Sequence, residues 1–224
     1  MEAKKKCVYC EDIADTREHI PARNLLQDTK GIHFITVPSC RSCNSKFQKD
    51  EEFFRQLLVS ILYEQSPVAG FLLDNPVARS MKRRPALGIQ MFKQMSLVDL
   101  YSKGGINLGK KTALQITKQD HKRVFSVLDK YVKGLFFHHF GVPIPNDWLI
   151  NHHWLTPKFE EKVVHSLKDM RWDRIKEDTF AYGFNSVPVT HQSIWCLIFF
   201  GQPLFYSFVI DRENAERFES HRKS

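Results

Sequence analysis

The sequence predicts an α+β fold, with a small N-terminal module of two strands and a helix followed by a mixed α/β C-terminal domain. Three observations lead to this prediction. Two Cys-x-x-Cys pairs, separated by 29 residues, enclose a strand-like run. Apolar residues recur at helical spacing over residues 45–65 and 118–140. Two apolar runs, residues 194–200 and 204–210, flank Gly-Gln-Pro and are typical of a β-hairpin.

The composition is that of a folded protein without a membrane span. The chain has 224 residues, of which 42% are hydrophobic, so it can bury a core, and wholesale disorder is excluded. Its apolar runs stay shorter than the roughly 18–20 residues that a membrane-spanning helix needs. Because no apolar segment of a signal peptide follows the basic N-terminus, we expect a cytoplasmic, reducing environment.

Four of the five cysteines form two pairs at a spacing typical of zinc sites. Each pair can supply two thiolates to one ion, which gives a closed tetrahedral site without a position for substrate. The alternatives are disulfides, which a reducing compartment disfavours, and a redox pair, which needs no second pair. We therefore expect a structural Zn²⁺ that holds the module folded. Its ligands would be Cys7, Cys10, Cys40 and Cys43, whereas Cys196 lies in an apolar run and is expected in the core.

The remaining features of the module follow in a fixed order along residues 1–65. The run Thr-Arg-Glu-His-Ile-Pro occupies residues 16–21, between the cysteine pairs. Residues 33–37 predict a strand that ends at Pro38. Residues 45–65 predict a helix, and Asn44 is expected to cap it, because asparagine is a favoured N-cap residue.

This order of features resembles the HNH endonucleases, also called ββα-metal or His-Me finger nucleases, and in particular those with a zinc-bound rim. The resemblance covers about residues 7–55 and rests on Cys-x-x-Cys, Glu-His-Ile-Pro and Cys-x-x-Cys-Asn in that order. It implies a zinc-stabilised ββα-metal module that hydrolyses DNA. It also implies that His19 is the general base, that Glu18 binds a catalytic Mg²⁺ or Mn²⁺, and that Asn44 is a second ligand or orients the histidine.

The chemistry of phosphodiester hydrolysis suits these residue types. A neutral imidazole accepts a proton from water near pH 7, and hard cations prefer carboxylate and amide oxygens. Adjacent residues of a strand point to opposite faces, so we expect a turn or a bulge that aims Glu18 and His19 at one site. The chain departs from the family in two ways, with glutamate in place of the commoner aspartate at position 18 and no final histidine after Asn44.

Each of these residues also has a structural interpretation. Asn44 can be a plain helix cap, and His19 an ordinary histidine. Lys46 and Arg55 either contact phosphate or stay solvated, and the histidine pairs at 138–139 and 152–153 are expected to be structural. The chain is therefore a metal-dependent DNA endonuclease or, alternatively, an RNA-directed nuclease or a non-catalytic zinc module that binds nucleic acid or protein.

Beyond residue 65 the sequence predicts a linker over residues 66–78 and a mixed α+β domain over residues 79–224. The linker contains two prolines and a glycine. The expected helices span residues 77–95, with a break at Arg84-Pro85, and residues 118–140 and 157–170, with a short final helix to about residue 219. The expected strands span residues 97–101, 113–116, 180–184, 194–200 and 204–210.

The excess of positive over negative charge in the chain lies in one middle segment. Residues 79–133 hold 13 Lys and Arg against 3 Asp and Glu, in a chain with a net charge of +8. Such a segment is typical of a surface that binds DNA phosphates, and a solvated face is the alternative. DNA is the expected partner, and the sequence leaves a homodimer open. The residues expected to bind DNA are Arg79, Lys82, Arg83, Arg84, Lys110, Lys111, Lys122 and Arg123.

Overall fold

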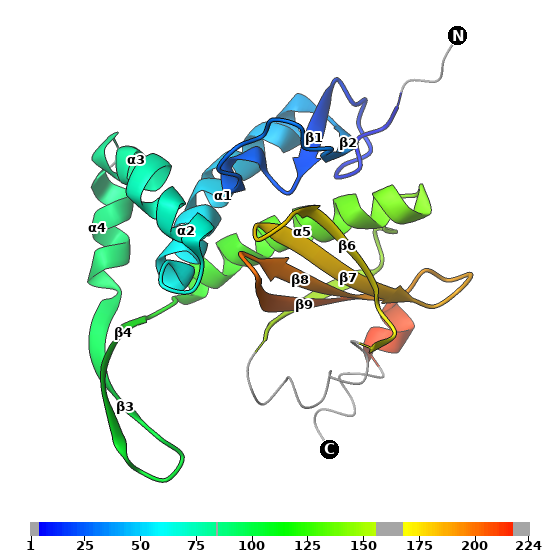
Figure 1. The fold of residues 1–224 in the computed structure, drawn as a ribbon. Coiled ribbons are helices and arrows are strands. Elements are labelled where there is room, and N and C mark those ends of the chain that lie inside the picture. Colours follow the sequence, from blue (N-terminus) through cyan, green and yellow to red (C-terminus); the bar gives the residue numbers. More distant parts are fainter. Residues whose placement is uncertain (1–4, 84, 156–167, 217–224) are drawn as a thin grey trace.

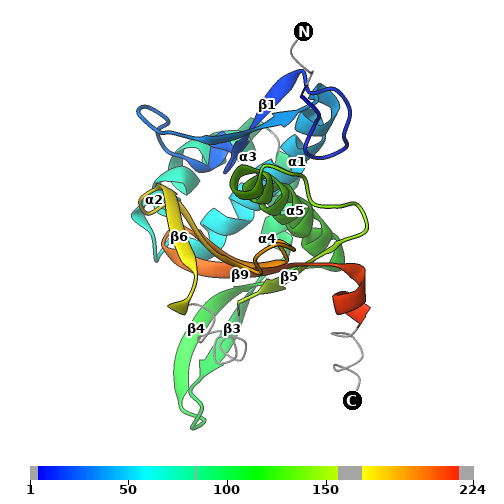
Figure 2. The same cartoon turned by 90° about the vertical axis from the view of Figure 1, so that its right-hand side faces the viewer.

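The computed structural model describes residues 5–83, 85–155 and 168–216 and confirms the α+β fold (Figure 1). An N-terminal hairpin and a long helix hold the four cysteines, and mixed helices, a second hairpin and a five-stranded antiparallel sheet follow. Helix α5 (Lys118–Phe140), with the bounds that the sequence predicts, lies between the N-terminal hairpin and the sheet (Figures 1 and 2). In the described part of the chain, the helices are too short or too polar to span a bilayer.

The N-terminal hairpin is regular. Strand β1 (Thr16–Ile20) pairs with β2 (Ile35–Ser39) in a continuous antiparallel register, with Glu18 opposite Val37 and His19 opposite Thr36. Strand β2 begins two residues later than predicted and includes Pro38, which this two-stranded sheet tolerates because both of its strands are edges. The expected turn or bulge at Glu18 and His19 is wrong, since every residue of β1 has a partner in register.

Helix α1 (Arg41–Leu62) begins earlier than predicted, because a cysteine caps it. The Sγ atom of Cys40 accepts a hydrogen bond from the backbone N–H of Cys43 at 3.4 Å. Asn44 therefore lies inside the first turn, where its N–H donates to the carbonyl of Cys40 at 3.0 Å, and its predicted role as the N-cap is wrong. The apolar stripe of α1, which includes Phe54 and Leu58, is buried as predicted.

Residues 66–78, predicted as a loop or linker, are helical. Ser66 caps α2 (Pro67–Leu72), a π-helical turn η2 (Leu73–Val77) follows, and α3 (Ala78–Arg83) continues from it. Pro76 lacks a backbone donor, which accounts for the widened turn around it. Buried Ala69, Leu72 and Val77 belong to the main core, so this segment is packed rather than free. Helix α4 (Pro85–Lys93) starts at the predicted break.

The rest of the chain forms two separate sheets. Strands β3 (Met95–Tyr101) and β4 (Asn107–Leu114) make an isolated hairpin, in which β4 starts earlier than predicted. The large sheet has the order β5-β9-β8-β7-β6, and its three inner strands confirm the predicted ones. Its edge strands β5 and β6 were not predicted, because histidines and charged residues hide their strand pattern. The bounds are β5 Leu149–Trp154, β6 Arg171–Lys176, β7 Phe180–Ser186, β8 Ser193–Phe199 and β9 Gln202–Ile210.

Two predicted helices extend beyond the described part of the chain. Most of the helix expected at 157–170 falls on residues 156–167, outside the described residues. The expected final helix starts at residue 212, and its predicted end also lies outside them.

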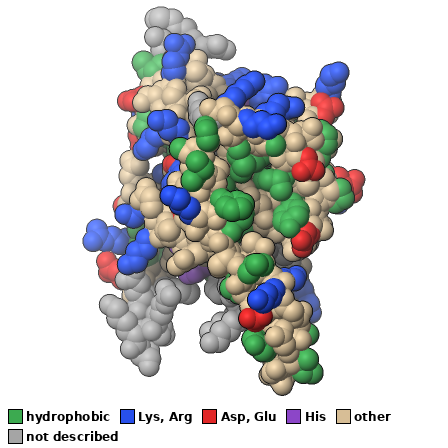
Figure 3. Space-filling model, turned by 90° about the vertical axis from the view of Figure 1, so that its left-hand side faces the viewer, with side chains coloured by type: hydrophobic (Ala, Val, Ile, Leu, Met, Phe, Trp, Pro, Cys, Tyr) green, Lys and Arg blue, Asp and Glu red, His purple; other side chains and the backbone are tan. Residues whose placement is uncertain are grey.

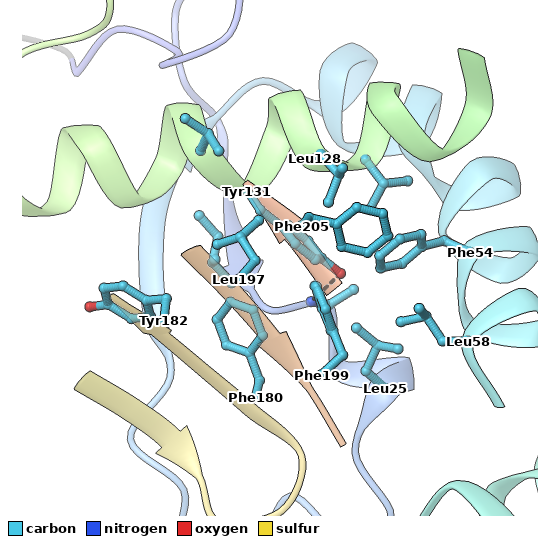
Figure 4. Packing of buried hydrophobic residues seen from close by; sticks show 14 of the residues in the cluster. Leu25, Phe54, Leu58, Leu128, Tyr131, Phe180, Tyr182, Leu197, Phe199 and Phe205 are labelled. Carbon is cyan, nitrogen blue, oxygen red and sulfur yellow. Dashed lines mark hydrogen bonds between the residues drawn. The ribbon is translucent and has the colours of Figure 1, made fainter. Parts of the chain in front are cut away.

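One hydrophobic core joins the N-terminal module to the rest of the chain (Figure 4). Tyr131 of α5 is fully buried at its centre, where its hydroxyl accepts a hydrogen bond from the N–H of Ala22 at 3.1 Å. The ring of Phe54 from α1 packs edge-on against Phe199 of β8 at 5.2 Å between centroids. Residues from α1, α5 and the large sheet thus bury one another, which fixes the hairpin relative to α5.

Gly134→Ala should lower the free energy of unfolding by about 1–3 kcal/mol, the usual cost of overpacking. A Cβ atom at position 134 would overlap the fully buried Cδ1 of Ile20, which outweighs the better helix propensity of alanine. Urea unfolding measures the change, with Lys122→Ala, an exposed position of the same helix, as the control. Wild-type stability of Gly134→Ala would contradict this close approach of α5 to the hairpin.

Candidate functional site

The four paired cysteines come together at one end of the N-terminal hairpin. Their Sγ atoms all lie within 4.8 Å of one another, and Cys10 and Cys40 are 3.6 Å apart. Cys7 and Cys10 lie in a turn before β1, whereas Cys40 and Cys43 lie at the start of α1. All four are free thiols, so the predicted cluster is confirmed and contains no disulfide.

The size of this cluster suits a zinc ion. Four thiolates at about 2.3 Å from Zn²⁺ lie about 3.8 Å from one another in a tetrahedron, close to the spacing of the cysteine cluster. The cluster joins the start of the chain to the start of α1, with the hairpin between. A bound zinc would therefore hold the hairpin and α1 together, which is a structural role.

Glu18 and His19 point to opposite faces of the N-terminal hairpin. This follows from the regular pairing of β1, in which side chains alternate between faces. Glu18 is 7% exposed and faces the core beside α1 and α5, whereas His19 is half-buried on the other face. The two residues that the family resemblance assigns to one active site are therefore separated by the strand itself.

Glu18 shares a buried ammonium group with Glu51. The Nζ atom of Lys130 on α5 is fully buried, lies 2.8 Å from Oε1 of Glu18, and forms a second ion pair with Oε1 of Glu51. Burial raises the pKa of Glu51, an effect that the charge of Lys130 opposes. The rings of Phe47 and Tyr131 lie within 6 Å of Nζ and exclude water from this group. We refer to Lys130, Glu18 and Glu51 as the buried triad.

The buried triad does not fit the catalytic cation that the resemblance implies. Oε1 of Glu18 is bound to the buried ammonium group, and the positive charge of that group repels a divalent cation at the same carboxylate. The side chain of Asn44 donates instead to the carbonyl of Arg17 at 3.4 Å, and within the described residues no contact joins it to Glu18. Oε2 of Glu18 is buried and has no hydrogen-bond partner among the described residues. Glu18 and Asn44 thus do not assemble a cation site in this structure.

His19 lies in a different environment, beside an arginine and a phenylalanine. Its ring packs edge-on against Phe34 at 5.1 Å between centroids, and the guanidinium carbon of Arg23 lies 5.8 Å from the centroid of the same Phe34 ring. Burial and the charge of Arg23 lower the pKa of His19 below its ordinary value. The imidazole is therefore neutral near pH 7, which is the form that accepts a proton.

The residue after Arg23, Asn24, lines a hollow whose other side chains are mainly basic and polar. The hollow measures about 610 Å³ and runs between η1 (Arg23–Leu25), α1 and α3. Nη1 of Arg55 donates to the carbonyl of Asn24 at 3.4 Å, while its buried Nε has no partner among the described residues. We refer to this feature as the basic hollow. Its lining is Asn24, Gln48, Lys49, Glu52, Arg55, Pro76, Arg79, Ser80 and Arg83.

The structure separates the residues that the sequence assigns to DNA binding. Arg79 and Arg83 line the basic hollow, and Lys82 is exposed on the same helix α3, whereas Arg84 lies outside the described residues. Lys110 and Lys111 are exposed on β4. Lys122 lines a second hollow of about 370 Å³ on α5, together with Lys46 and Lys133.

Arg123 is engaged within the protein. Its Nε atom lies 2.9 Å from Oδ1 of Asp50, its Nη2 donates to the carbonyl of Lys49 at 2.8 Å, and its guanidinium lies over the ring of Phe53. These contacts attach α5 to α1, so the side chain holds two helices together rather than standing free for phosphate.

His139 and His152, one from each histidine pair, have protein partners, as expected of structural residues. His152 is buried between Ser207 at 2.7 Å and Asp129 at 3.0 Å. Burial lowers the pKa of His139 to about 4, and its Nε2 lies 2.9 Å from the hydroxyl of Tyr182. His33 is exposed. Within the described residues, the four cysteines are the one group of side chains that could hold a metal ion.

Sequence reasoning missed Lys130 and Arg23. Lys130 lies in the apolar stripe of α5, between the buried residues Val127 and Tyr131, and a charge at such a position is a signal of a buried ion pair. Arg23 follows Pro21 by two residues and carries no comparable signal, because only the fold of the loop brings it to His19.

In comparisons with known proteins, no family model, no curated protein and no solved structure matches this chain.

The purified protein should contain one zinc per chain, and Cys40→Ser should lose the metal and unfold the N-terminal module, since binding a structural zinc contributes to folding. Metal analysis by mass spectrometry and circular dichroism provide the readouts. Cys196→Ala is the matched control, because this thiol is buried in the large sheet away from the cluster and should leave the zinc content unchanged. Folded wild-type protein without zinc would refute the four-thiolate site.

Lys130→Met should destabilise the protein by about 3–5 kcal/mol, because it leaves two buried carboxylates without their counter-charge. The loss should be smaller at pH 5 than at pH 8. Removing the Lys130 charge, which lowers the pKa of Glu51, raises that pKa further in the folded variant, so the variant binds a proton more tightly when folded than when unfolded, and this compensation fades as the pH rises. Urea unfolding at both pH values tests this, and adding Glu18→Gln and Glu51→Gln should restore most of the stability. A small loss, equal at both pH values, would contradict a buried ion pair.

Proposed function

We propose that this protein is a zinc-stabilised endonuclease that hydrolyses phosphodiester bonds in DNA, with His19 as the general base. The observation that carries the proposal is the position of His19, a neutral and partly accessible imidazole beside Arg23 and close in the chain to the basic hollow. The sequence resemblance to the HNH endonucleases supports the same assignment for His19.

The groups around His19 suit the parts of this reaction. His19 takes a proton from water as the water oxygen forms a bond to phosphorus. The bond from phosphorus to the leaving oxygen breaks, and the leaving oxygen takes a proton from solvent. Negative charge then develops on the phosphoryl oxygens, where the guanidinium of Arg23 can stabilise it. The basic hollow, with four cations against Glu52, can hold a neighbouring phosphate of the strand.

Glu18 acts in this proposal as a positioning residue. Its ion pair with Lys130 fixes β1 on α5, and strand alternation then directs the next residue, His19, to the opposite face. Because Glu18 and Asn44 do not fit a divalent cation, the proposed reaction contains no cation step. The dependence of cleavage on Mg²⁺ or Mn²⁺ is a separate measurement.

The buried triad favours a second candidate function, a zinc module that binds nucleic acid without cleaving it. A carboxylate neutralised by a buried ammonium is what a retained fold with a lost cation site would contain. Binding by the basic hollow needs neither Glu18 nor a cation. The same surface could bind RNA, so the substrate assay includes both nucleic acids.

His19→Ala should reduce cleavage of plasmid DNA by about 10²–10⁴-fold while zinc content, stability and DNA affinity stay close to wild type, because a general base acts on the barrier. Cleavage is measured on plasmid, linear and single-stranded DNA and on RNA, with and without added Mg²⁺ or Mn²⁺. His33→Ala is the matched control, since this exposed histidine lies in the loop that connects β1 to β2.

The pH profile gives an independent check. The lowered pKa of His19 places the acid limb of the cleavage rate below pH 6.5, since the rate falls only when the imidazole becomes protonated. Wild-type cleavage by His19→Ala would refute the assignment of the base. Binding without cleavage of any nucleic acid by the wild type would establish the second candidate instead.

A further inference from the structure

The hairpin of β3 and β4 extends away from the body of the protein (Figures 1 and 2). We refer to residues 95–114 as the basic ribbon. Its two strands form a sheet of their own, and residues 96–101 and 103–112 are all exposed. A two-stranded sheet without a covering layer is marginally stable in water, so this exposure indicates a surface that a partner covers.

The basic ribbon has a defined shape despite its exposure. The strands pair from Met95 opposite Leu114 to Tyr101 opposite Asn107. At the tip, Ser102 donates its N–H to the carbonyl of Ile106 at 2.8 Å, and its Oγ accepts the N–H of Ile106 at 3.0 Å. The strands span roughly 24 Å, at about 3.4 Å per residue. The ribbon is therefore long enough to cross either groove of DNA, since the wider one, the major groove, is about 12 Å wide.

Lysines and apolar side chains occur on both faces of the basic ribbon, and Asp99 lies opposite Lys110 on one of them. Lys110 and Lys111 are neighbours on β4 and so point to opposite faces, and Lys103 lies at the tip. Leu97 opposite Thr112 shares the face of Lys110, whereas Val98 is opposite Lys111. Three apolar side chains also lie near the tip and are exposed: Tyr101 at 58%, Ile106 at 68% and Leu108 at 60%.

This two-faced arrangement selects among the partners that could cover the ribbon. A flat partner, such as a membrane surface, covers one face and leaves the lysine of the other unused. A second copy of the chain would bring like charges together, since seven described lysines and arginines from Arg79 to Lys111 accompany Asp99 alone. The walls of a DNA groove carry phosphates on both sides of an inserted ribbon, which matches lysines on both faces.

The neighbouring surface continues the positive charge. The face formed by α3, α4 and the basic ribbon shows Lys and Arg side chains in its upper part, hydrophobic side chains in its middle and the ribbon at its lower end (Figure 3). Lys82 and Arg83 on α3 and Lys93 on α4 are exposed. A duplex held by the ribbon can therefore contact further cations toward the basic hollow.

We propose that the basic ribbon inserts into a groove of double-stranded DNA, with Lys110 and Lys111 on the phosphates of its two walls and the side chain of Ile106 against the bases. Apolar side chains at such a tip can wedge between base pairs and bend the duplex. The inference rests on the proposed function for its choice of DNA, but it concerns binding and is independent of cleavage.

The test measures binding and bending by the full-length protein carrying His19→Ala, which prevents cleavage of the probe. A fluorescein-labelled duplex of about 30 base pairs, short against the persistence length of DNA, is titrated by anisotropy at several salt concentrations, and donor and acceptor dyes at its ends report bending. Lys110→Ala with Lys111→Ala should weaken binding at least tenfold and reduce the log–log salt slope by about 1.8, or 0.9 per phosphate contact.

Ile106→Ser should weaken binding about fivefold and abolish bending without a change in salt slope, because it removes no charge. The matched controls are exposed residues of the large sheet and its loops. Lys168 and Arg171 are the control for the lysine pair, and Val189 is the control for Ile106. Lys168→Ala with Arg171→Ala, and Val189→Ser, should bind like the parent.

Several results would overturn the proposal. These are a parent protein that does not bind the duplex, ribbon variants that bind it as the parent does, and preference for phosphatidylserine vesicles over the duplex. A dimer in sedimentation that Ile106→Ser dissociates would assign the ribbon to a second copy instead. Ribbon-dependent binding by a wild-type protein that cleaves nothing would refute the proposed function and leave this inference standing.

Discussion

The ammonium group of Lys130 lies fully buried where β1, α1 and α5 meet, and the position of the N-terminal hairpin depends on its two carboxylate partners. A buried charge without a partner costs several kcal/mol, so the fold holds only when Glu18 and Glu51 both face this point. Neighbouring residues of the same helix strengthen the contact. Tyr131 accepts a hydrogen bond from Ala22, and Gly134 lets Ile20 approach the helix backbone.

The geometry around Lys130 also decides which side chains can act together. Once Glu18 points to the ammonium group, the alternation of an extended strand sends His19 to the opposite face. His19 then meets Arg23 and Phe34 instead of a carboxylate. The cysteine cluster fixes the other end of the hairpin, so both ends of β1 are held and little freedom remains to turn Glu18 outward. In this structure the carboxylate of Glu18 thus has an internal counter-ion in place of a cation site.

The basic segment of the sequence is divided among separate places in the fold. Arg79 and Arg83 line the basic hollow because residues 66–78 form packed helices that bring α3 to α1. Arg123 is used internally, and Lys110 and Lys111 lie on the exposed hairpin. A stretch of charge along the chain therefore corresponds to a basic hollow, a helix–helix contact and a basic ribbon, which have different physical roles.

The sequence by itself determined the elements whose signals are local. The cysteine spacing predicted the four-thiol cluster, and apolar periodicity predicted α5 with its bounds and the inner strands of the large sheet. Local signals also misled: Asn44 is a favoured cap, but the sulfur of Cys40 caps α1, and the prolines of residues 66–78 begin or widen helices instead of forming a loop.

Only the tertiary structure decided the direction of Glu18, because its counter-ion Lys130 is more than one hundred residues away along the chain. It also decided that Arg23 meets His19 and that Arg123 meets Asp50. The physical reason is that spacing along a chain encodes the repeat of a helix or strand and the separation of the ligands of a metal site. The partner of a charge depends on which surfaces the whole chain buries against one another.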